Sequence, residues 1–351
     1  MKDHDLQQLE ELLRPLFHEL SSSDSEEGFE EESGVRKAIE FALQIPIRQN
    51  SKLDQTEPPE LKGQRIGQYE IGDRIGSGGM GVVYRARHIH LQTDVAIKIL
   101  PHRRAANPSS VARFEREMRL QANVDHLNVV TAVDGGVDDG QYYVVMKYVD
   151  GIDGAKAVAQ LSKLPVEAAS EIVRQAALGL QHLHKHDLVH RDIKPANMIV
   201  GYDGIVRLID FGLARVEADN DPAPLTQTDQ VLGTVSYMAP EQFTGSLPVT
   251  LQSDIYSLGA AFHYLLTGRA PARFASSETG SATSAEECGN EIQPDVALTL
   301  DRFLAVDPHQ RFSTAAEAAE ALVDLADTDS LTVVVERLKA DTTSGAQPSA
   351  L

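Results

Sequence analysis

The stretch HLHKHDLVHRDIKPANMIV, residues 182–200, decides between two kinds of chemistry. Three of its histidines recur every fourth residue, and on a helix they would share one face and form a metal site. The repeat is interrupted at residues 187–189, where we expect the helix to have ended, so the three imidazoles would not share a face. The chemistry then belongs to the run HRDIKPAN (190–197), which groups an arginine, an aspartate, a lysine and an asparagine.

Charge and composition exclude several classes of protein. The 351 residues carry a net charge of -20, which would repel nucleic acids and anionic membrane surfaces, so we expect no nucleic-acid partner. Cys288 is the single cysteine, which excludes a disulfide framework and a thiolate metal site. The strongest apolar run, residues 255–266, is too short to span a bilayer and predicts a buried helix. Residues 1–13 lack the apolar core of a signal peptide, and we expect a cytoplasmic protein without a membrane span.

Residues 1–67 form an acidic N-terminal extension. The first sixty residues hold 15 acidic and 6 basic side chains, and their apolar spacing predicts one or two short helices followed by a linker. Short helices bury little surface alone, so the extension either docks on the main domain or binds a protein partner. A mobile acidic leader is the alternative.

The main domain covers residues 68–325 and changes character part-way. Residues 68–148 alternate apolar residues with glycine turns, which predicts strands around one helix that begins near Pro108. Residues 149–325 have a mostly helical pattern with short strands. Residues 326–351 predict a polar C-terminal tail, in which LTVVVERL is the one segment able to form a further element.

A glycine motif, Gly76-x-Gly78-x-x-Gly81, opens the β-rich part. Alone it also fits a dinucleotide-binding turn, but such a turn leads into a helix. Here the β-branched run VVYRARH follows, so we expect the glycines in a hairpin between two strands. Such a hairpin can lay its backbone N–H groups over phosphates, and a plain glycine hairpin remains the alternative.

A lysine follows in the strand VAIK, residues 95–98. Val83 and Ala96 would flank a flat ring, and Lys98 would point inward. A strand lysine is usually solvated, so the site requires a buried anion and a carboxylate partner. Glu117 supplies that carboxylate, with Glu115 as the less favoured candidate.

The run HRDIKPAN and the later Asp210-Phe211-Gly212 form the most specific part of the pattern. Asn197 and Asp210 flank a predicted strand hairpin and can converge on a hard cation through oxygen ligands. Asp192 would lie beside them as a proton acceptor and Lys194 as a positive charge for the transferring group. The tripeptide Ala-Pro-Glu, residues 239–241, completes the series.

The ordered series of motifs resembles the Hanks-type (eukaryotic-like) serine/threonine protein kinases, closest to the bacterial PknB-like group, over residues 68–325. The resemblance implies an α+β, two-lobed protein kinase fold, with a small β-rich N-lobe and a larger α-helical C-lobe. It also implies transfer of the γ-phosphate of ATP to serine or threonine hydroxyls of protein substrates, in signal transduction. Mg²⁺ is the implied metal, with Mn²⁺ as an alternative.

The same resemblance assigns roles residue by residue. The residues implied to bind ATP are Ile75, Gly76, Gly78, Gly81, Val83, Ala96, Lys98, Met146, Lys147, Val149 and Ile199. The residues implied in catalysis are Lys98, Glu117, Asp192 and Lys194, and the metal ligands are Asn197 and Asp210. The residues implied to support the site are His190, Arg191, Phe211, Glu241, Asp254 and Arg311.

Regulation by phosphorylation is implied as well. Lys194 and Thr234 match the serine/threonine pattern, and Arg191 resembles kinases whose activation loop is ordered by a phosphate. Thr226 and Thr228 are the implied phosphosites, and a kinase homodimer would allow autophosphorylation in trans. Two ordinary loop threonines are the alternative for the switch, and a catalytically inactive scaffold is the alternative for the enzyme.

Three features depart from the family pattern. Lys147 stands where the hinge commonly has Glu, but backbone groups do most of the adenine recognition, so we expect ATP binding to survive. Gln121 occupies a position that is usually apolar, and a polar residue there would loosen the helix and make activity depend on a partner. Residues 271–294 are polar and short, so the substrate cannot be inferred from the family.

Overall fold

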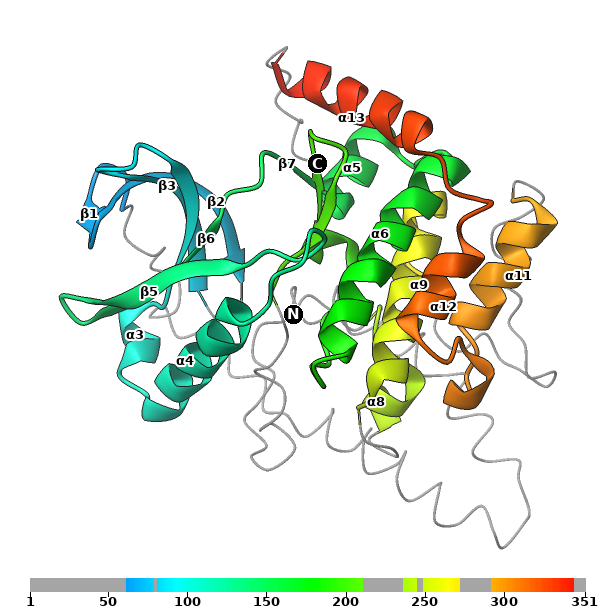
Figure 1. Cartoon of the computed structure of the whole chain (residues 1–351), viewed down its shortest axis with the longest axis horizontal. Helices are drawn as coiled ribbons and strands as arrows, with labels where there is room; N and C mark the ends of the chain where they lie inside the picture. Colours follow the sequence, from blue (N-terminus) through cyan, green and yellow to red (C-terminus); the bar gives the residue numbers. More distant parts are fainter. Residues whose placement is uncertain (1–60, 79–80, 211–235, 245–248, 272–291, 344–351) are drawn as a thin grey trace, which may run out of the picture.

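The computed structural model describes residues 61–78, 81–210, 236–244, 249–271 and 292–343. A small lobe built on an antiparallel sheet is followed along the chain by a larger helical lobe (Figure 1). This is the predicted α+β, two-lobed architecture. No helix within the described ranges is long and apolar enough to cross a membrane.

The N-lobe sheet has six antiparallel strands in the order β1-β2-β3-β4-β6-β5. Its strands are β1 (Arg65–Ile66), β2 (Tyr69–Gly78), β3 (Gly81–His88), β4 (Asp94–Ile99), β5 (Ala132–Asp138) and β6 (Gln141–Lys147). Alternate residues of β3 face inward, and Tyr84 packs with Ile97 and Val145 in the lobe core. The glycine motif forms the predicted hairpin, because Gly78 pairs with Gly81 at the end of β2 and β3.

Two helices follow β4 before the sheet resumes. The short α3 (His102–Ala105) leads to α4 (Pro108–Ala122), which begins at the predicted proline. Asn107 caps α4 by accepting a hydrogen bond from the Ser109 N–H, and proline suits the first helical position because no N–H is needed there. α4 lies beside β5 (Figure 1) and buries Phe114, Glu117 and Gln121.

The C-lobe is organised around two buried helices, α6 (Val166–His184) and α9 (Leu251–Thr267). The other helices are α5 (Gly154–Leu161), α8 (Pro240–Thr244), α11 (Pro294–Phe303), α12 (Ala315–Ala321) and the 3-10 turns η1 (Pro195–Asn197) and η4 (Pro308–Gln310). A small antiparallel sheet of β7 (Gly151–Asp153), β8 (Met198–Gly201) and β9 (Val206–Leu208) lies beside them. The apolar run 255–266 forms the interior of α9, as predicted.

Both ends of α9 are fixed by local chemistry. Thr250 and Ser253 form a reciprocal capping box at the start, and Gly268 ends the helix in the left-handed conformation at φ 72°. In the middle of the helix, a Cβ on Gly259 would collide with Phe303, so the glycine allows α11 to approach closely. α9 is therefore held in position along its whole length.

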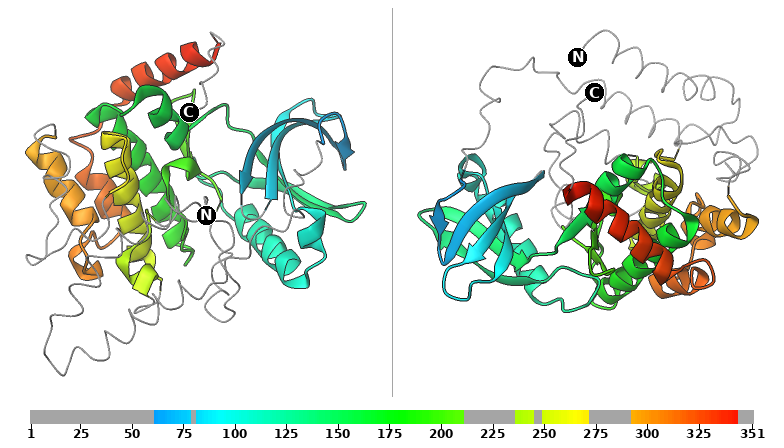
Figure 2. Two further views of the ribbon diagram at one scale, coloured as in Figure 1. Left: turned by 180° about the vertical axis from the view of Figure 1, so that it is seen from behind. Right: turned by 90° about the horizontal axis from the view of Figure 1, so that it is seen from above.

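The polar tail predicted after residue 325 contains a helix, centred on the segment LTVVVERL that was expected to be able to form a further element, and the helix is longer than that segment. Residues Thr328–Thr343 form α13, which packs against α6 and lies across the end of the helical lobe (Figure 2). Leu331, Val334, Val335 and Leu338 are buried in the C-lobe core. The spacing of these four residues is helical, and burial of this one face stabilises a segment whose average composition is polar.

The boundary of the N-terminal extension also needs a correction. β1 pairs with β2, and Leu61 packs against the core of the N-lobe sheet. The folded domain therefore begins by residue 61 rather than at residue 68. The two short helices predicted in the extension lie outside the described residues.

We expect Leu338→Ala to lower the free energy of unfolding by about 2–5 kcal/mol, because it leaves a cavity at a fully buried position. Val333→Ala on the same helix removes a side chain that is 66% exposed and should change stability by less than about 0.5 kcal/mol. Chemical denaturation of both variants measures the difference. Equal small effects would mean that α13 is not part of the folded core.

Candidate active site

A buried lysine joins three parts of the chain. Lys98 on β4 is 4% exposed, and its Nζ lies 2.8 Å from Glu117 Oε1 on α4. The same Nζ lies 2.8 Å from Asp210 Oδ1, which follows β9. Glu117 is thus the partner of Lys98, whereas the alternative Glu115 pairs with Arg119.

Burial and charge act against one another in this group. Burial alone would lower the pKa of Lys98, but the Asp210 and Glu117 carboxylates raise it above its ordinary value. Burial raises the pKa of Glu117, although Lys98 opposes this. Burial would also raise the pKa of Asp210, but the Lys98 charge holds it below its usual range. Lys98 is therefore a fixed buried cation.

The catalytic-loop residues form a second connected group. Lys194 Nζ lies 2.9 Å from Asp192 Oδ2. Asn197 Nδ2 donates to the Asp192 carbonyl oxygen at 2.7 Å and to Asp192 Oδ2 at 2.9 Å. Since the Asn197 amide nitrogen is committed to Asp192, its Oδ1 faces away from that residue.

The donor set fits a magnesium ion. Asn197 Oδ1 and the carboxylate of Asp210 are hard oxygen ligands, and magnesium usually takes only one or two protein ligands besides water and phosphate oxygens. Within the described residues, no group of three or more His, Cys, Asp or Glu side chains could hold a metal ion. Asn197 Oδ1 and the Asp210 carboxylate would provide a partial cage, of the kind that magnesium shares with a phosphate substrate.

Asp254 of α9 binds the backbone of the catalytic loop, residues 190–197. Its Oδ2 accepts the His190 N–H at 2.7 Å, and its Oδ1 accepts the Arg191 N–H at 2.7 Å. Arg191 has φ 66°, a left-handed conformation that is costly for a residue with a side chain. The two hydrogen bonds compensate for this strain and fix the direction in which Asp192 leaves the loop.

His190 is fully buried, and burial lowers its pKa, so the ring is neutral. Its Nε2 lies 3.2 Å from the Ile209 carbonyl oxygen, which assigns the proton to Nε2 because a carbonyl only accepts. Its Nδ1 then accepts the Asp192 N–H at 3.4 Å. Phe211, the residue expected to pack on His190, lies outside the described residues.

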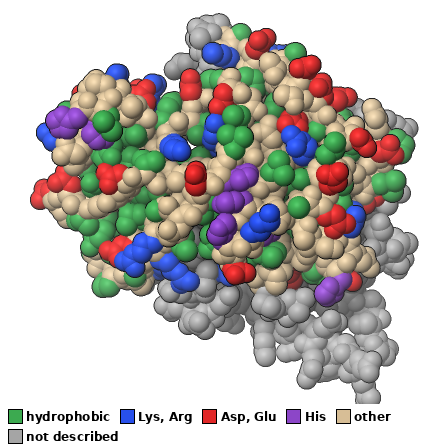
Figure 3. Space-filling model, viewed as in Figure 1, with side chains coloured by type: hydrophobic (Ala, Val, Ile, Leu, Met, Phe, Trp, Pro, Cys, Tyr) green, Lys and Arg blue, Asp and Glu red, His purple; other side chains and the backbone are tan. Residues whose placement is uncertain are grey.

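The other histidines of the opening stretch separate into two groups. His184, to which the sequence assigned no role, is buried with its Nε2 3.0 Å from Asp254 Oδ2. His182 stacks on His126 at 4.9 Å between ring centroids and lies 4.6 Å from His186. These rings belong to a histidine stripe near the centre of the face in Figure 3. His190 stands apart from them, so the three imidazoles four residues apart do not share a face.

An apolar cluster lies between the lobes where a flat ring would bind. Four of its residues were predicted to bind ATP: Val83, Ala96, Met146 and Val149. The other two, Val130 and Ile209, were not predicted. Val130 and Ile209 follow no local motif, and only the fold brings them to the cluster. Two predicted contacts lie outside the cluster: Ile75 is 40% exposed on β2, and Ile199 is half-buried on β8.

The glycine hairpin lies close to Lys98. A Cβ at Gly81 would lie 2.5 Å from the Ile99 carbonyl oxygen, so glycine is required where β3 meets β4. Gly76 pairs with Val83 across the hairpin, which connects the glycine motif to the apolar cluster. The hairpin thus brings bare backbone next to the buried cation.

Lys147 lines a cavity that does not contain the catalytic residues. This cavity of about 620 Å³ is lined by the hinge residues 147–150 and by Lys339 of α13, among others. None of Lys98, Asp192 and Asp210 lines it. The backbone N–H of Lys147 donates to the Thr131 carbonyl oxygen at 3.3 Å. The departure at Lys147 therefore changes a surface away from Lys98, Asp192 and Asp210, in a cavity that shares Val130 and Val149 with the apolar cluster.

A model of the protein kinase domain matches residues 69–323. The chain belongs to the protein kinase family. Its kinase domain is similar to the serine/threonine-protein kinase PknB of Mycobacterium leprae, with 36% identity over 281 residues that cover 76% of this chain and 44% of the relative. PrkC of Bacillus subtilis, also a serine/threonine-protein kinase, is 36% identical over 279 residues, which cover 77% of this chain and 42% of PrkC.

Solved structures resemble this kinase domain as well. The crystal structure of the PknI kinase domain of Mycobacterium tuberculosis matches with a TM-score of 0.56 and 29% identity, covering 76% of this chain and 98% of that chain. The chain spans less than half the length of the curated relatives PknB and PrkC. The similarity thus concerns the kinase domain.

A cationic pocket adjoins the catalytic loop of the kinase domain. The pocket, of about 420 Å³, is lined by Arg116 and Arg119 of α4, by Arg191 and by one acidic residue, Asp187. Leu120 and Leu188 are among its apolar lining residues. Arg191 was predicted as a site residue, whereas Arg116 and Arg119 were not. Their position on the same helix as Glu117 could have indicated that they lie near the site. Thr226 and Thr228 lie outside the described residues.

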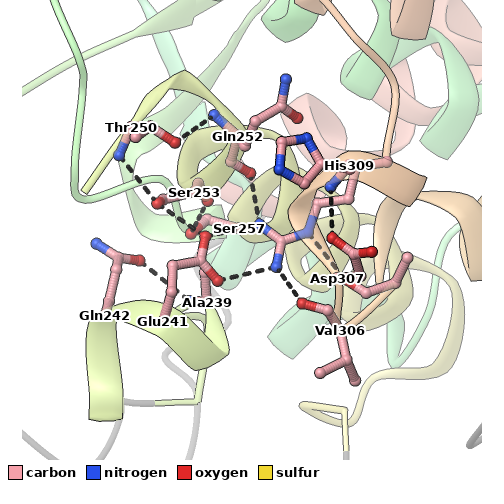
Figure 4. A network of polar contacts seen from close by, with 12 residues as sticks. Ala239, Glu241, Gln242, Thr250, Gln252, Ser253, Ser257, Val306, Asp307 and His309 are labelled. Carbon is pink, nitrogen blue, oxygen red and sulfur yellow. Dashed lines mark hydrogen bonds and ion pairs between the residues drawn. The ribbon is translucent and has the colours of Figure 1, made fainter. Parts of the chain in front are cut away.

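A buried ion pair fixes the lower part of the C-lobe. Arg311 binds Glu241 through two parallel contacts, Nη1–Oε1 at 2.7 Å and Nη2–Oε2 at 2.9 Å. Figure 4 shows Glu241 with its neighbours Gln252, Ser253 and Val306. The remaining three N–H groups of Arg311 donate to the carbonyl oxygens of Gln252, Ala305 and Val306. All five donors of the guanidinium are thus satisfied, which is the condition under which a buried arginine is tolerated.

We expect Glu241→Gln to lower the free energy of unfolding at pH 7 by about 3 kcal/mol, because it leaves the buried Arg311 charge without its carboxylate. Burial would raise the pKa of Glu241, but the Arg311 bond holds it below 4.5 in the folded kinase domain. This contribution is therefore present above pH 4.5 and is lost as the pH falls through the lower, folded pKa.

Denaturation of wild type and Glu241→Gln at several pH values tests this linkage. The difference between the two proteins should be largest near pH 7 and should shrink below pH 4.5. Glu115→Gln, which removes a surface i,i+4 partner of Arg119, is the control and should cost less than about 0.5 kcal/mol. A constant difference at all pH values would contradict the ionised state of Glu241.

Proposed function

We propose that this chain is an ATP- and magnesium-dependent serine/threonine protein kinase. The observation that carries the proposal is the buried Lys98 held between Glu117 and Asp210, 2.8 Å from each. Such an arrangement keeps a cation at the place where the phosphates of ATP would bind, next to the glycine hairpin. The family membership supports the same activity.

Each part of the site has a role in phosphoryl transfer. Lys98 and the backbone of the glycine hairpin would bind and orient the phosphates of ATP. The hinge backbone and the apolar cluster would hold the adenine. Asn197 and Asp210 would hold magnesium, which supplies charge neutralisation for the phosphates when bound.

Asp192 would accept a hydrogen bond from the substrate hydroxyl and then its proton. The hydroxyl oxygen forms a bond to the γ-phosphorus, and the bond from that phosphorus to the oxygen of ADP breaks. Lys194, 2.9 Å from Asp192, would stabilise the negative charge of the transferring group. ADP and a phosphorylated protein are the products.

We expect Asp192→Asn to reduce phosphate transfer from labelled ATP to a generic basic protein by at least about 100-fold, because amide nitrogen cannot accept the proton. Chelation of magnesium should abolish the activity of the wild-type protein. Asp139→Asn is the matched control, since Asp139 is exposed in the β5–β6 turn and its φ of 47° suits Asn. Identical labelling by wild type and Asp192→Asn would exclude the kinase and favour a scaffold.

We also propose that the kinase is switched on by phosphorylation of Thr226 or Thr228. A phosphate carries about two negative charges, and the three arginines of the pocket exceed its one aspartate, Asp187, so the pocket keeps positive charge for it even though Arg119 also pairs with Glu115. Two of these arginines lie on α4, which also carries Glu117. A phosphate bound there would therefore act on the helix that completes the active site.

We expect preincubation with ATP and magnesium to raise wild-type activity on the order of tenfold, and Thr226→Ala with Thr228→Ala to abolish that increase. Thr332→Ala, on the exposed side of α13, is the control. If two copies phosphorylate each other, the activation rate should rise with protein concentration. Mass spectrometry identifies the phosphorylated residues. If the double variant is activated as strongly as wild type, Thr226 and Thr228 are not the activating phosphosites.

The acidic extension is proposed to bind a protein partner. The 15 acidic and 6 basic side chains of residues 1–60 suit a basic protein surface rather than nucleic acid. The physiological substrate would then be selected outside the catalytic groups. A cytoplasmic location stays a prediction.

A further inference from the structure

Gln121 is a buried amide beside the active-site ion pair. It lies one turn after Glu117 on α4 and is 2% exposed. Its Nε2 donates to Glu117 Oε1 at 3.4 Å, a long hydrogen bond to an oxygen that already accepts Lys98 Nζ at 2.8 Å. Among the described residues, no donor reaches Gln121 Oε1.

Turning the amide over does not remove the problem. The carbonyl oxygen of Gln121 would then face the carboxylate of Glu117, and two acceptors would repel each other. The amide nitrogen would in turn face the position where Oε1 has no donor. The present orientation is the better one, and it still leaves one buried polar atom unpaired.

The unpaired oxygen raises the free energy of the arrangement that contains it. A buried acceptor without a donor loses its hydration and gains nothing in exchange, whereas a long hydrogen bond at 3.4 Å compensates little. An apolar side chain of the same size would avoid this cost and pack beside Phe114, on the same buried face of α4. The cost disappears if α4 moves outward and the amide reaches water.

We propose that Gln121 is a positioning residue that keeps the basal activity low by opposing the inward position of α4. This rests on the proposed kinase function. The inward position is the one in which Glu117 pairs with Lys98. Gln121 shifts the population of α4 away from it, and a phosphate on the cationic pocket restores it, because Arg116 and Arg119 lie on the same helix.

The test replaces Gln121 by Leu and by Met, in protein that carries Thr226→Ala with Thr228→Ala and is therefore unphosphorylated there. We expect kcat/KM for ATP to rise roughly 5–30-fold in both variants, which is the factor that one unsatisfied buried group is worth. Binding of a non-hydrolysable ATP analogue should tighten in parallel. With Thr226 and Thr228 intact and phosphorylated, the two variants should differ from wild type by less than about twofold, because α4 is already inward.

Gln121→Glu separates polarity from shape. It keeps the length of the side chain but places a second carboxyl group beside Glu117, where Gln121 Nε2 lies 3.4 Å from Glu117 Oε1, so its basal activity should be no higher than that of wild type. A rise with Glu equal to that with Leu would overturn the proposal. So would a fall, or no change, with both Leu and Met.

The experiments distinguish a wrong role for Gln121 from a wrong kinase function. If phosphorylated wild type is active and sensitive to Asp192→Asn but Leu and Met leave basal activity unchanged, the kinase function stands and the role of Gln121 is wrong. If no variant transfers phosphate, the kinase function fails. The binding measurement then still decides whether Gln121 opposes the nucleotide-binding arrangement.

Discussion

The arrangement of the catalytic loop depends on one buried carboxylate, that of Asp254. It is 1% exposed and accepts the backbone N–H groups of His190 and Arg191, with His184 Nε2 as a third neighbour. A buried charge is tolerated only when donors surround it, and here the donors are the loop itself. The carboxylate is thereby satisfied, and the left-handed Arg191 is held in place. Asp192 then occupies its position because its two predecessors are bonded to α9.

The same end of α9 also fixes the Glu241–Arg311 pair. Ser253, next to Asp254, donates through its Oγ to Glu241 Oε1 at 2.9 Å, and Gln252 supplies a carbonyl oxygen to Arg311. In the first turn of α9, Asp254 therefore binds the catalytic loop, while Gln252 and Ser253 bind the buried ion pair. Since α9 is fixed at both ends and packed in the middle, it acts as a rigid frame for both groups. This polar network explains why so many charged side chains can be buried in the C-lobe.

Local patterns in the sequence predicted the elements and the residues that carry a motif, but not the contacts that only the fold creates. The strands around Lys98 and the helices α4, α6 and α9 follow from alternation, capping and apolar spacing. His184 and His182 have equivalent local sequences, and only Asp254, seventy residues later, distinguishes them. Val130 and Ile209 reach the apolar cluster through the pairing of distant strands and loops. For α13, the sequence indicated only that residues 331–338 were able to form an element, because the four buried residues are diluted by polar ones in the average composition of the segment.

Two buried groups that support the active site, Asp254 of α9 and Gln121 of α4, differ in how well they are satisfied. On the C-lobe side, Asp254 and Arg311 have partners for every contact that burial demands. On the N-lobe side, Glu117 shares one oxygen between Lys98 and Gln121, and Gln121 keeps an unpaired oxygen. A group that is fully bonded has one favoured position, whereas one with an unpaired atom gains by moving toward water. This contrast between Asp254 and Gln121 supports the proposal that α4, rather than the first turn of α9, is the adjustable support of the site.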